Sequence, residues 1–298
     1  MRVGVIGLGS IGLGMAASLR KAGHEVIGVD LAAARRAEFE KLGGRASANA
    51  ADAARDADCV FCVVINAAQT EQVLFGAQGI AEVMPRGGVF LSCATLPPEG
   101  AKALAARLDA LGRHYLDTPT SGGPARAMAG EITIMGSGAA AAFEAAAPAL
   151  EAVAAKVYRL GDAPGAGSAM KLVNQLLAGV HIAAACEAMA FAIRLGLEPR
   201  QVYDVITHAA GSSWMFENRV PHILEGDYAP KSAVSIFTKD LGIVLDTARA
   251  SQFPIPMASM GLQMFEMAAA AGMAQDDDAS VARVYAQLAG LTLPAGKP

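Results

Sequence analysis

The sequence predicts an α/β fold for its first half and an all-helical fold for its second half. Short apolar runs alternate with helical patterns up to about residue 163, which is typical of a doubly wound parallel sheet. Beyond that point, strand-like runs become scarce and long helical patterns follow one another. We therefore predict two domains, 1–163 and 164–298, with a long interdomain helix opening the second.

The composition narrows the possible classes of protein. Hydrophobic residues make up 53% of the 298 residues and charged ones only 17%, which indicates packed alanine-rich helices or a large subunit interface. The net charge of −4 offers no basic surface for nucleic acid, so a small-molecule ligand is expected. The N-terminus lacks a signal-peptide pattern, and the apolar segment 172–193 carries Asn174, Gln175, His181 and Glu187. We expect a cytoplasmic protein that does not span a membrane.

The four cysteines and the acidic run near the C-terminus do not indicate a metal site. Cys59 and Cys62 form a CxxC inside the apolar run DCVFCVVI, where positions three apart point to opposite faces of a strand. We expect reduced, buried thiols and no metal. Asp276–Asp278 is expected to be a solvated helix start.

The first strand and the first helix enclose a glycine-rich turn. The buried-strand pattern RVGVIG (2–7) leads through GLGSIG (7–12) into a helix. This context is the dinucleotide-binding fingerprint of a Rossmann-type domain: Gly7 permits the tight turn, Gly9 lets the backbone approach a pyrophosphate, and Gly12 allows close packing. Ser10 and Ile11 begin the helix, whose N–H groups would face the phosphates.

The second strand, EVIGVD, ends in a carboxylate. Asp30 lies 23 residues after Gly7, where it can accept both ribose hydroxyls and would repel a 2′-phosphate. Arg35 and Arg36 follow only after an intervening Leu-Ala-Ala-Ala. We therefore predict NAD rather than NADP as cofactor; the alternative is a solvated aspartate at a strand end.

The alternation continues with helices at about 32–42, 50–56 and 69–83 and strands near 44–47, 58–65 and 88–95. Ligands of open α/β sheets bind at the carboxyl ends of the strands. We therefore expect Val64, Ile65 and Thr95 to face the cofactor. Thr95 could instead cap the helix that opens at Pro97.

A short strand, HYLD, precedes the turn-rich segment TPTSGGP. Ser121, Gly122 and Gly123 offer a hydroxyl and unhindered N–H groups, a suitable cradle for a carboxylate; the alternative is an ordinary glycine-rich turn. A strand at 132–137, a helix at 139–154 and a strand at 156–161 complete the domain.

The second half contains helical patterns at 166–194, 199–210, 213–224, 234–251, 255–270 and 278–289. In the first of them Lys171, Asn174 and Gln175 share one face because they lie at i, i+3 and i+4. A lysine on so apolar a helix predicts a catalytic acid/base, with the two amides orienting the substrate or the lysine; an ion-paired structural lysine is the alternative.

Four motifs in order resemble the β-hydroxyacid dehydrogenase family, which includes 3-hydroxyisobutyrate dehydrogenase and tartronate semialdehyde reductase. They are GLGSIGLGMAASL (7–19), DTPTSGG (117–123), GAGSAMKLVNQ (165–175) and FTKDLGIVLDTA (237–248). The resemblance implies that Ser121–Gly123 bind the substrate carboxylate and that Lys171 is catalytic. It also implies that Lys239 closes over the nicotinamide region.

Two departures narrow the resemblance. The usual family pattern has two asparagines where this chain has Asn174-Gln175, and the segment 208–224 differs from the hydroxyisobutyrate enzymes. Both, with VVINAAQTEQVLFG (63–76), resemble the L-threonate dehydrogenase branch, which implies oxidation of a four-carbon sugar acid to its 2-oxo acid. Polar residues in 208–224 would then reach additional hydroxyls, or else cap helices around a core of Trp214–Phe216.

The expected activity is therefore NAD-dependent oxidation of a small hydroxy acid by a homodimer or homotetramer. Neutral Lys171 would take the hydroxyl proton, which requires a pKa below the ordinary value of about 10.4 and is favoured by desolvation. The alternatives are a 3-hydroxyisobutyrate dehydrogenase, a tartronate semialdehyde reductase, and a catalytically inactive NAD-binding regulatory protein. The oxidised carbon and the physiological direction do not follow from the sequence.

Overall fold

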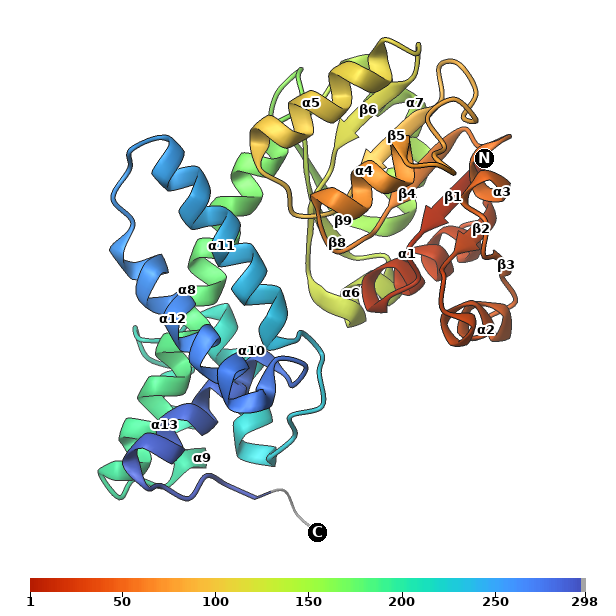
Figure 1. Cartoon of the computed structure of the whole chain (residues 1–298). Coiled ribbons are helices and arrows are strands. Elements are labelled where there is room, and N and C mark those ends of the chain that lie inside the picture. Colours follow the sequence, from red (N-terminus) through yellow and green to blue (C-terminus); the bar gives the residue numbers. More distant parts are fainter. Residues whose placement is uncertain (296–298) are drawn as a thin grey trace. The chain divides into compact units, whose positions relative to one another are not determined.

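The computed structural model describes residues 1–295. The chain forms two compact units, which divide between Lys171 and Leu172, inside the helix α8 (Ala166–Arg194). The first unit is α/β and the second helical (Figure 1). This is the α/β fold followed by a helical domain that the sequence predicts. The domain boundary at 163/164 stays a prediction, because a division by contacts does not identify which residues serve which function.

The first unit is built on a six-stranded parallel sheet in the order β3-β2-β1-β4-β5-β6. β4 and β5 are completely buried, as expected for parallel strands covered on both faces. The strands are β1 (Arg2–Ile6), β2 (Glu25–Val29), β3 (Arg45–Ser47), β4 (Cys59–Cys62), β5 (Val89–Ser92) and β6 (His114–Asp117).

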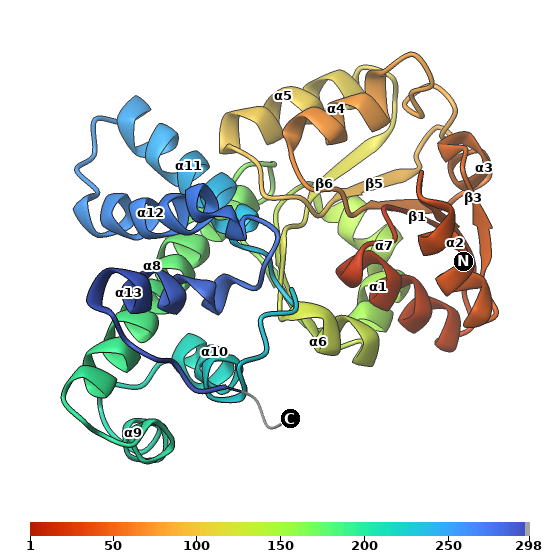
Figure 2. The ribbon, with the colours of Figure 1, turned by 60° about the horizontal axis from the view of Figure 1, so that its bottom comes forward.

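Helices cover both faces of this sheet and form two separate cores. Figure 2 shows α4 (Ala67–Phe75) and α5 (Pro98–Asp109) on one face and α1 (Ser10–Lys21), α6 (Gly123–Ala129) and α7 (Ala140–Val153) on the other. α2 (Ala33–Lys41) and α3 (Ala50–Ala54) flank β2 and β3. One core contains Met15, Leu19 and Phe143, and the other contains Leu74 and Leu104.

A second, three-stranded sheet follows the large one, in the order β7-β8-β9. β7 (Thr120–Ser121) runs antiparallel to β8 (Ile132–Gly136), and β9 (Ala154–Arg159) runs parallel to β8. β7 follows directly after β6, so the segment that contains Ser121–Gly123 leaves the large sheet and becomes an edge of the small one.

The second unit consists of helices around one apolar core, in which the rings of Phe237 and Phe265 stack with their centroids 5.0 Å apart. A π-helical turn, Ala269–Met273, follows α12, and a 3₁₀ turn, Asp278–Ser280, precedes α13. The α-helices after α8 are α9 (Pro199–Ile206), α10 (Trp214–Glu225), α11 (Val234–Ala250), α12 (Pro256–Ala268) and α13 (Val281–Ala289).

Helix α8 is the one helix of residues 1–295 that is long and apolar enough to cross a membrane. Half of its most apolar 18-residue stretch is buried, and its residues Ile182, Cys186 and Met189 belong to the core of the second unit. A core helix passes the same length and hydropathy test as a membrane span, so its composition does not identify a span.

Several element boundaries differ from the sequence prediction. The strand expected at 58–65 spans only Cys59–Cys62, because its pairing with β1 and β5 ends there. Asn66 then caps α4 by accepting from the Gln69 backbone N–H at 2.9 Å. α4 ends at Phe75 rather than near 83, since Gly76 is extended. Helix α6 was not predicted, although Pro124 in its first turn and Gly130 in the left-handed conformation at its end are ordinary helix signals.

The expectation that Asp276–Asp278 is solvated was wrong for two of the three residues. Asp277 caps the following 3₁₀ turn, but it is buried and lies 2.8 Å from His222 Nδ1. Asp278 is also buried and forms an ion pair with Arg219 at 2.6 Å. Burial alone would raise the pKa of Asp277, but hydrogen bonds from His222, Ala279 and Lys231 hold that pKa below its ordinary value.

Candidate active site

The glycine-rich turn after β1 has the geometry that a pyrophosphate requires. A Cβ at Gly12 would lie 1.8 Å from the Gly7 carbonyl oxygen, so only glycine allows α1 to start so close to the turn. Gly7 has a φ of +93°, and a Cβ at this position would lie only 2.4 Å from the Val63 carbonyl oxygen, so a side chain does not fit here. At Gly9, by contrast, nothing lies within 4 Å of the Cβ position, which leaves the backbone accessible to a ligand. Ser10 and Ile11 follow as the first residues of α1, where backbone N–H groups have no partner within the helix.

Asp30 lies directly after β2 and is tied to this turn. Its Oδ2 accepts from the Leu8 backbone N–H at 2.9 Å, and its Oδ1 accepts from the Ala32 N–H at 2.8 Å. A carboxylate has about four lone-pair positions, so both oxygens retain capacity to accept from ribose hydroxyls. Arg36 donates to the backbone carbonyls of Asp30 and Leu31, and Arg35 pairs with Glu38.

Val64, Ile65 and Thr95 follow the carboxyl ends of β4 and β5. Ile65 is exposed, and its backbone N–H donates to Gln69 Oε1 at 2.8 Å. Thr95 is buried, and it is not the cap of α5, because Pro97 occupies the N-cap position. The alternative role of Thr95 as a helix cap is therefore wrong, whereas its contact with the cofactor stays a prediction.

The carboxylate cradle lies at the end of β7 and the start of α6. Ser121 pairs with Thr133 of β8, and Gly122 and Gly123 have φ values of +140° and +79°, which favour glycine. Nothing lies within 4 Å of a Cβ built at Gly123. Gly122 is the N-cap of α6. The backbone N–H groups of the first turn of this helix therefore lie next to Ser121 and have no partner within the helix.

Lys171 is the last residue of the first unit. It is far from the cradle residues in sequence but lies close to them in space. Its side chain is only 9% exposed, and its Nζ donates to the Thr120 carbonyl oxygen at 2.8 Å. Thr120 immediately precedes Ser121 in β7. The structure therefore brings the predicted acid/base and the predicted carboxylate cradle together.

In the second unit, a chain of side chains joins the third motif to the fourth. Asn174 Nδ2 donates to Gln175 Oε1 at 2.9 Å, and Gln175 Nε2 donates to Asp240 Oδ2 at 2.5 Å. The other oxygen of Asp240 forms an ion pair with Lys239 at 2.5 Å. Gln175 and Asp240 are buried, whereas Asn174 is partly exposed. The longer glutamine side chain thus binds a neighbouring carboxylate.

Within 208–224, the serines that precede α10 make local contacts. Ser213 caps α10 by accepting from the Phe216 N–H at 3.0 Å, and Ser212 donates to Glu217 at 2.9 Å. Phe216 belongs to the core, but Trp214 is 49% exposed. Under the alternative in which this segment only caps helices around a core, helix capping is therefore confirmed for Ser213, whereas the core position of Trp214 is wrong.

Sequence reasoning missed two buried aspartates that organise these groups, Asp117 and Asp240. Both stand inside quoted motifs, and Asp117 ends the apolar strand pattern YLD, which was the available signal for that residue. Burial raises the pKa of Asp117, and hydrogen bonds from Ser168, Gly165 and Ser137 oppose that rise.

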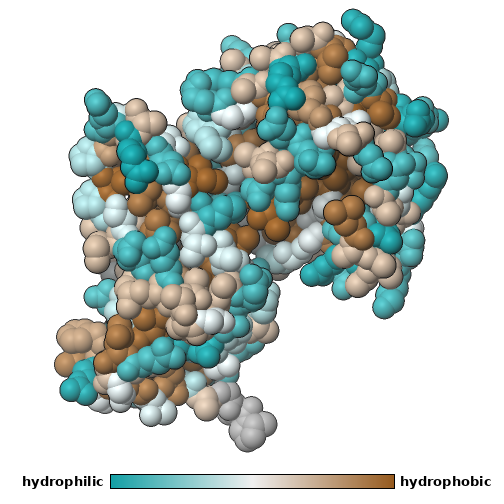
Figure 3. All heavy atoms as spheres, viewed as in Figure 1, coloured by the Kyte–Doolittle hydropathy of each residue, from teal (hydrophilic) through white to brown (hydrophobic). Residues whose placement is uncertain are grey.

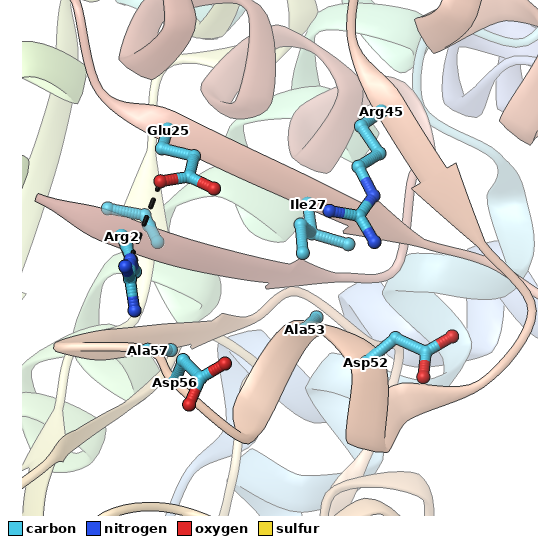
Figure 4. Close-up of a pocket in the computed structure, with 9 residues that line it drawn as sticks. Arg2, Glu25, Ile27, Arg45, Asp52, Ala53, Asp56 and Ala57 are labelled. Carbon is cyan, nitrogen blue, oxygen red and sulfur yellow. Dashed lines mark ion pairs between the residues drawn. The ribbon is translucent and has the colours of Figure 1, made fainter.

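A separate cavity of about 220 Å³ lies at the amino ends of β1, β2 and β3 (Figure 4). Its charged lining residues include Arg2, Glu25 and Arg45, the first residues of β1, β2 and β3, and Arg2 pairs with Glu25 at 3.5 Å. Ligands of open α/β sheets bind at the carboxyl ends of the strands, so this cavity is not the candidate site. Residues 1–295 contain no group of three or more His, Cys, Asp or Glu suited to a metal.

The turn, Asp30 and α1 fit a dinucleotide, and a buried lysine beside a carboxylate cradle fits a hydroxy acid. These features define a dinucleotide-dependent hydroxy acid dehydrogenase.

Comparison of the chain with known families and proteins leads to the same class. Residues 2–161 match the family described as the NAD binding domain of 6-phosphogluconate dehydrogenase, and residues 165–285 match the family described as NAD-binding of NADP-dependent 3-hydroxyisobutyrate dehydrogenase. The L-threonate dehydrogenase of Cupriavidus necator is 53% identical over 98% of this chain and 97% of its own length. That of Escherichia coli K12 is 48% identical over 99% and 97%.

Among solved structures, the 3-hydroxyisobutyrate dehydrogenase of Salmonella typhimurium superposes with a TM-score of 0.90. It is 49% identical, and the match covers 95% of this chain and 99% of that one. The chain belongs to the 3-hydroxyisobutyrate dehydrogenase-like family of β-hydroxyacid dehydrogenases. It is an NAD-dependent oxidoreductase that acts on the CH–OH group of a small hydroxy acid.

Proposed function

We propose that the protein oxidises L-threonate to its 2-oxo acid, with NAD as the hydride acceptor. The observation that carries the proposal is the 53% identity to an L-threonate dehydrogenase over nearly the full length of both chains. Gln175, which stands where the family usually has a second asparagine, and the segment 63–76 both resemble the L-threonate dehydrogenase branch and support the same substrate.

Lys171 is the general acid/base in this proposal. Bound NAD supplies the acceptor for the hydride that leaves C2 of the acid. As that C–H bond breaks, the hydroxyl proton passes to the neutral amine of Lys171 and the C2–O bond becomes a carbonyl. In the reverse direction the ammonium returns the proton. The buried amine, 2.8 Å from the Thr120 oxygen, supports this role because its position is fixed beside the cradle.

The other groups bind and orient. Ser121, Gly122 and Gly123 hold the substrate carboxylate through a hydroxyl and backbone N–H groups. Asn174 and Gln175 orient the substrate or the lysine, and Lys239 serves the cofactor; their connection through Asp240 supports a common function. The cofactor contacts are Gly7, Gly9, Ser10, Ile11, Gly12, Asp30, Val64, Ile65 and Thr95.

We also propose that the enzyme prefers NAD to NADP. The negative charge of Asp30 would repel a 2′-phosphate, and Arg35 and Arg36 are engaged with Glu38 and with backbone carbonyls. A higher kcat/KM with NADP than with NAD would contradict this preference.

A homodimer or homotetramer in the cytoplasm completes the proposal, with residues 1–163 binding NAD and residues 164–298 serving the substrate and the subunit interface. One observation supports the assembly and another the division. Apolar residues reach the surface of the helical unit (Figure 3). The exposed apolar residues of this unit include Phe191, Leu195, Met257 and Met260. The two matched families meet between residues 161 and 165, which supports the division.

The deciding experiment measures NADH formation with L-threonate, D-glycerate and 3-hydroxyisobutyrate, each with NAD and with NADP. The highest kcat/KM is expected for L-threonate. A preference for 3-hydroxyisobutyrate would favour the activity named for the Salmonella structure instead. Measurable NAD binding with no turnover on any acid would favour an inactive NAD-binding protein.

The assignment of Lys171 is tested by Lys171→Ala. We expect kcat to fall at least about 100-fold, the usual scale for removing a general acid/base, while NAD still binds. Lys41→Ala is the matched control, because Lys41 is exposed at the end of α2. Near-normal turnover of Lys171→Ala would refute the assignment.

A further inference from the structure

The carboxylate of Asp117 is buried at the end of β6 and accepts several hydrogen bonds from the start of α8. Its Oδ2 accepts from the backbone N–H groups of Gly165 and Ser168 at 3.0 and 2.7 Å. Its Oδ1 accepts from the Ser168 hydroxyl at 2.7 Å. The Ser137 hydroxyl donates to Oδ2 at 3.2 Å. One carboxylate thus receives backbone and side-chain donors from the first turn of the helix that carries Lys171.

The physical effect is to anchor the N-terminus of α8. The first N–H groups of a helix have no partner within it, and an anion there is favoured by the helix dipole. A carboxylate that binds both a backbone N–H and a hydroxyl of the same residue, Ser168, fixes rotation as well as distance. The first turn of α8 is therefore held in one orientation about the helix axis.

The glycines of the third motif make this close approach possible. A Cβ at Gly167 would lie 2.7 Å from the Asp117 carbonyl oxygen and 2.4 Å from that of Met135. Gly165 has a φ of +112°, which favours glycine. The Gly167 N–H donates to Ser137 Oγ at 2.9 Å, and Ser137 exchanges backbone hydrogen bonds with Asp117.

The same short segment contacts α8 at two points. Asp117 holds its first turn, and three residues later the Thr120 carbonyl accepts from Lys171 Nζ at 2.8 Å. The segment then continues into Ser121–Gly123. The distance between the lysine amine and the cradle therefore depends on how this segment is joined to the helix.

We propose that Asp117 is a positioning residue for the acid/base, which holds the first turn of α8 against residues 117–123 so that Lys171 and the carboxylate cradle keep a fixed separation. This rests on the proposed function of both groups. Displacement of a reacting group by about 1 Å can cost on the order of 100-fold in rate. Loosening the anchor should therefore lower kcat without weakening NAD binding.

The test compares two buried serines of the same unit. Ser168→Ala removes the hydroxyl bond to Asp117 and keeps the backbone bond. Ser18→Ala is the matched control, since the buried Ser18 hydroxyl donates to the Ala127 carbonyl at 3.0 Å. We expect both to lower the unfolding temperature, but only Ser168→Ala to lower kcat, by about 10- to 100-fold.

The pH profile separates positioning from a purely structural role. In Ser168→Ala the acidic limb of the kcat profile should move, because the environment of the lysine changes, while the Kd for NAD and the profile of Ser18→Ala stay as in the parent. Asp117→Asn should show the larger kcat loss, because an amide N–H would face the Ser168 or Gly165 donors. Ser168→Ala with the kcat and pH profile of Ser18→Ala overturns the proposal. No turnover of the parent on any acid would instead contradict the proposed function.

Discussion

The contrast between Gly9 and Gly12 provides a direct test of the cofactor turn. Both are glycines of GLGSIG, but a Cβ at Gly12 would lie 1.8 Å from the Gly7 carbonyl oxygen, whereas nothing lies within 4 Å of a Cβ at Gly9. Gly9 also has a φ of −63°, which alanine adopts freely. Alanine at the two positions should therefore have opposite consequences for folding and for cofactor binding.

For Gly9→Ala we expect the free energy of unfolding to change by less than about 1 kcal/mol, the usual range for a residue at an N-cap. NAD binding should weaken, because the added methyl keeps the pyrophosphate from the backbone N–H groups. Losing one charge-assisted hydrogen bond costs about 1.5–3 kcal/mol, which corresponds to a rise in Kd of about 10- to 100-fold.

For Gly12→Ala the 1.8 Å contact is with backbone, which cannot rotate away, so α1 must shift. Overpacking of this kind costs about 1–3 kcal/mol or more, and the gain in helix propensity offsets only about 1 kcal/mol of it. Urea unfolding without cofactor and calorimetric titration with NAD measure the two effects. Gly100→Ala is the control, since its Cβ would meet only Pro97 at an ordinary 3.7 Å.

Two results would refute this reasoning. Unchanged NAD affinity in Gly9→Ala would mean that the pyrophosphate does not cross this residue. A Gly12→Ala variant as stable as the parent would mean that α1 is not packed as closely as the 1.8 Å distance requires.

Three further predictions concern the thiols, acid stability and the glutamine. Because all four cysteines are buried and burial raises the pKa of each thiol, the native chain should react with no thiol reagent at pH 8 and the denatured chain with four equivalents. The lowered pKa of Asp277 stabilises the fold above the unfolded pKa of about 3.9, and this is lost as pH falls through the folded pKa. The stability advantage over Asp277→Asn should therefore shrink as the pH falls below about 4 in urea titrations. Gln175→Asn shortens the side chain that reaches Asp240, so kcat should fall about tenfold with unchanged NAD affinity; an unaltered kcat would exclude this function of the contact.

The sequence was sufficient to predict the features that depend on local pattern. Buried strands, the glycine turn and the long helix with Lys171 follow from periodicity and from residue types with special backbone freedom. The strand at 58–65 was predicted too long, because Val63–Ile65 are as apolar as the strand itself, although pairing with both neighbouring strands ends at Cys62. Apolar periodicity does not mark where pairing with a neighbouring strand stops.

Contacts between distant segments could not be predicted in the same way. Asp117 meets Ser168 and Asp240 meets Gln175 across 51 and 65 residues, so no local pattern joins them. Asp277 was misread for the same reason: an acidic run is usually solvated, and the His222 that makes its burial tolerable lies 55 residues earlier. Each aspartate is visible in the sequence, but the sequence does not show which distant residue it contacts.

The two halves of the proposed site are supported by very unequal secondary structure. The turn proposed to receive the cofactor follows β1, an interior strand of the six-stranded sheet, whereas the proposed carboxylate cradle begins in β7, a two-residue edge strand. Local opening is easiest where few backbone hydrogen bonds must break. We therefore expect the amides of Thr120–Ser121 to exchange with solvent deuterium much faster than those of β1. If the cofactor turn is rigid and the carboxylate cradle opens easily, the dinucleotide can bind to the free enzyme, whereas the acid binds to a segment that must first be ordered. This difference favours compulsory-order kinetics, in which the dinucleotide binds before the acid and leaves after it.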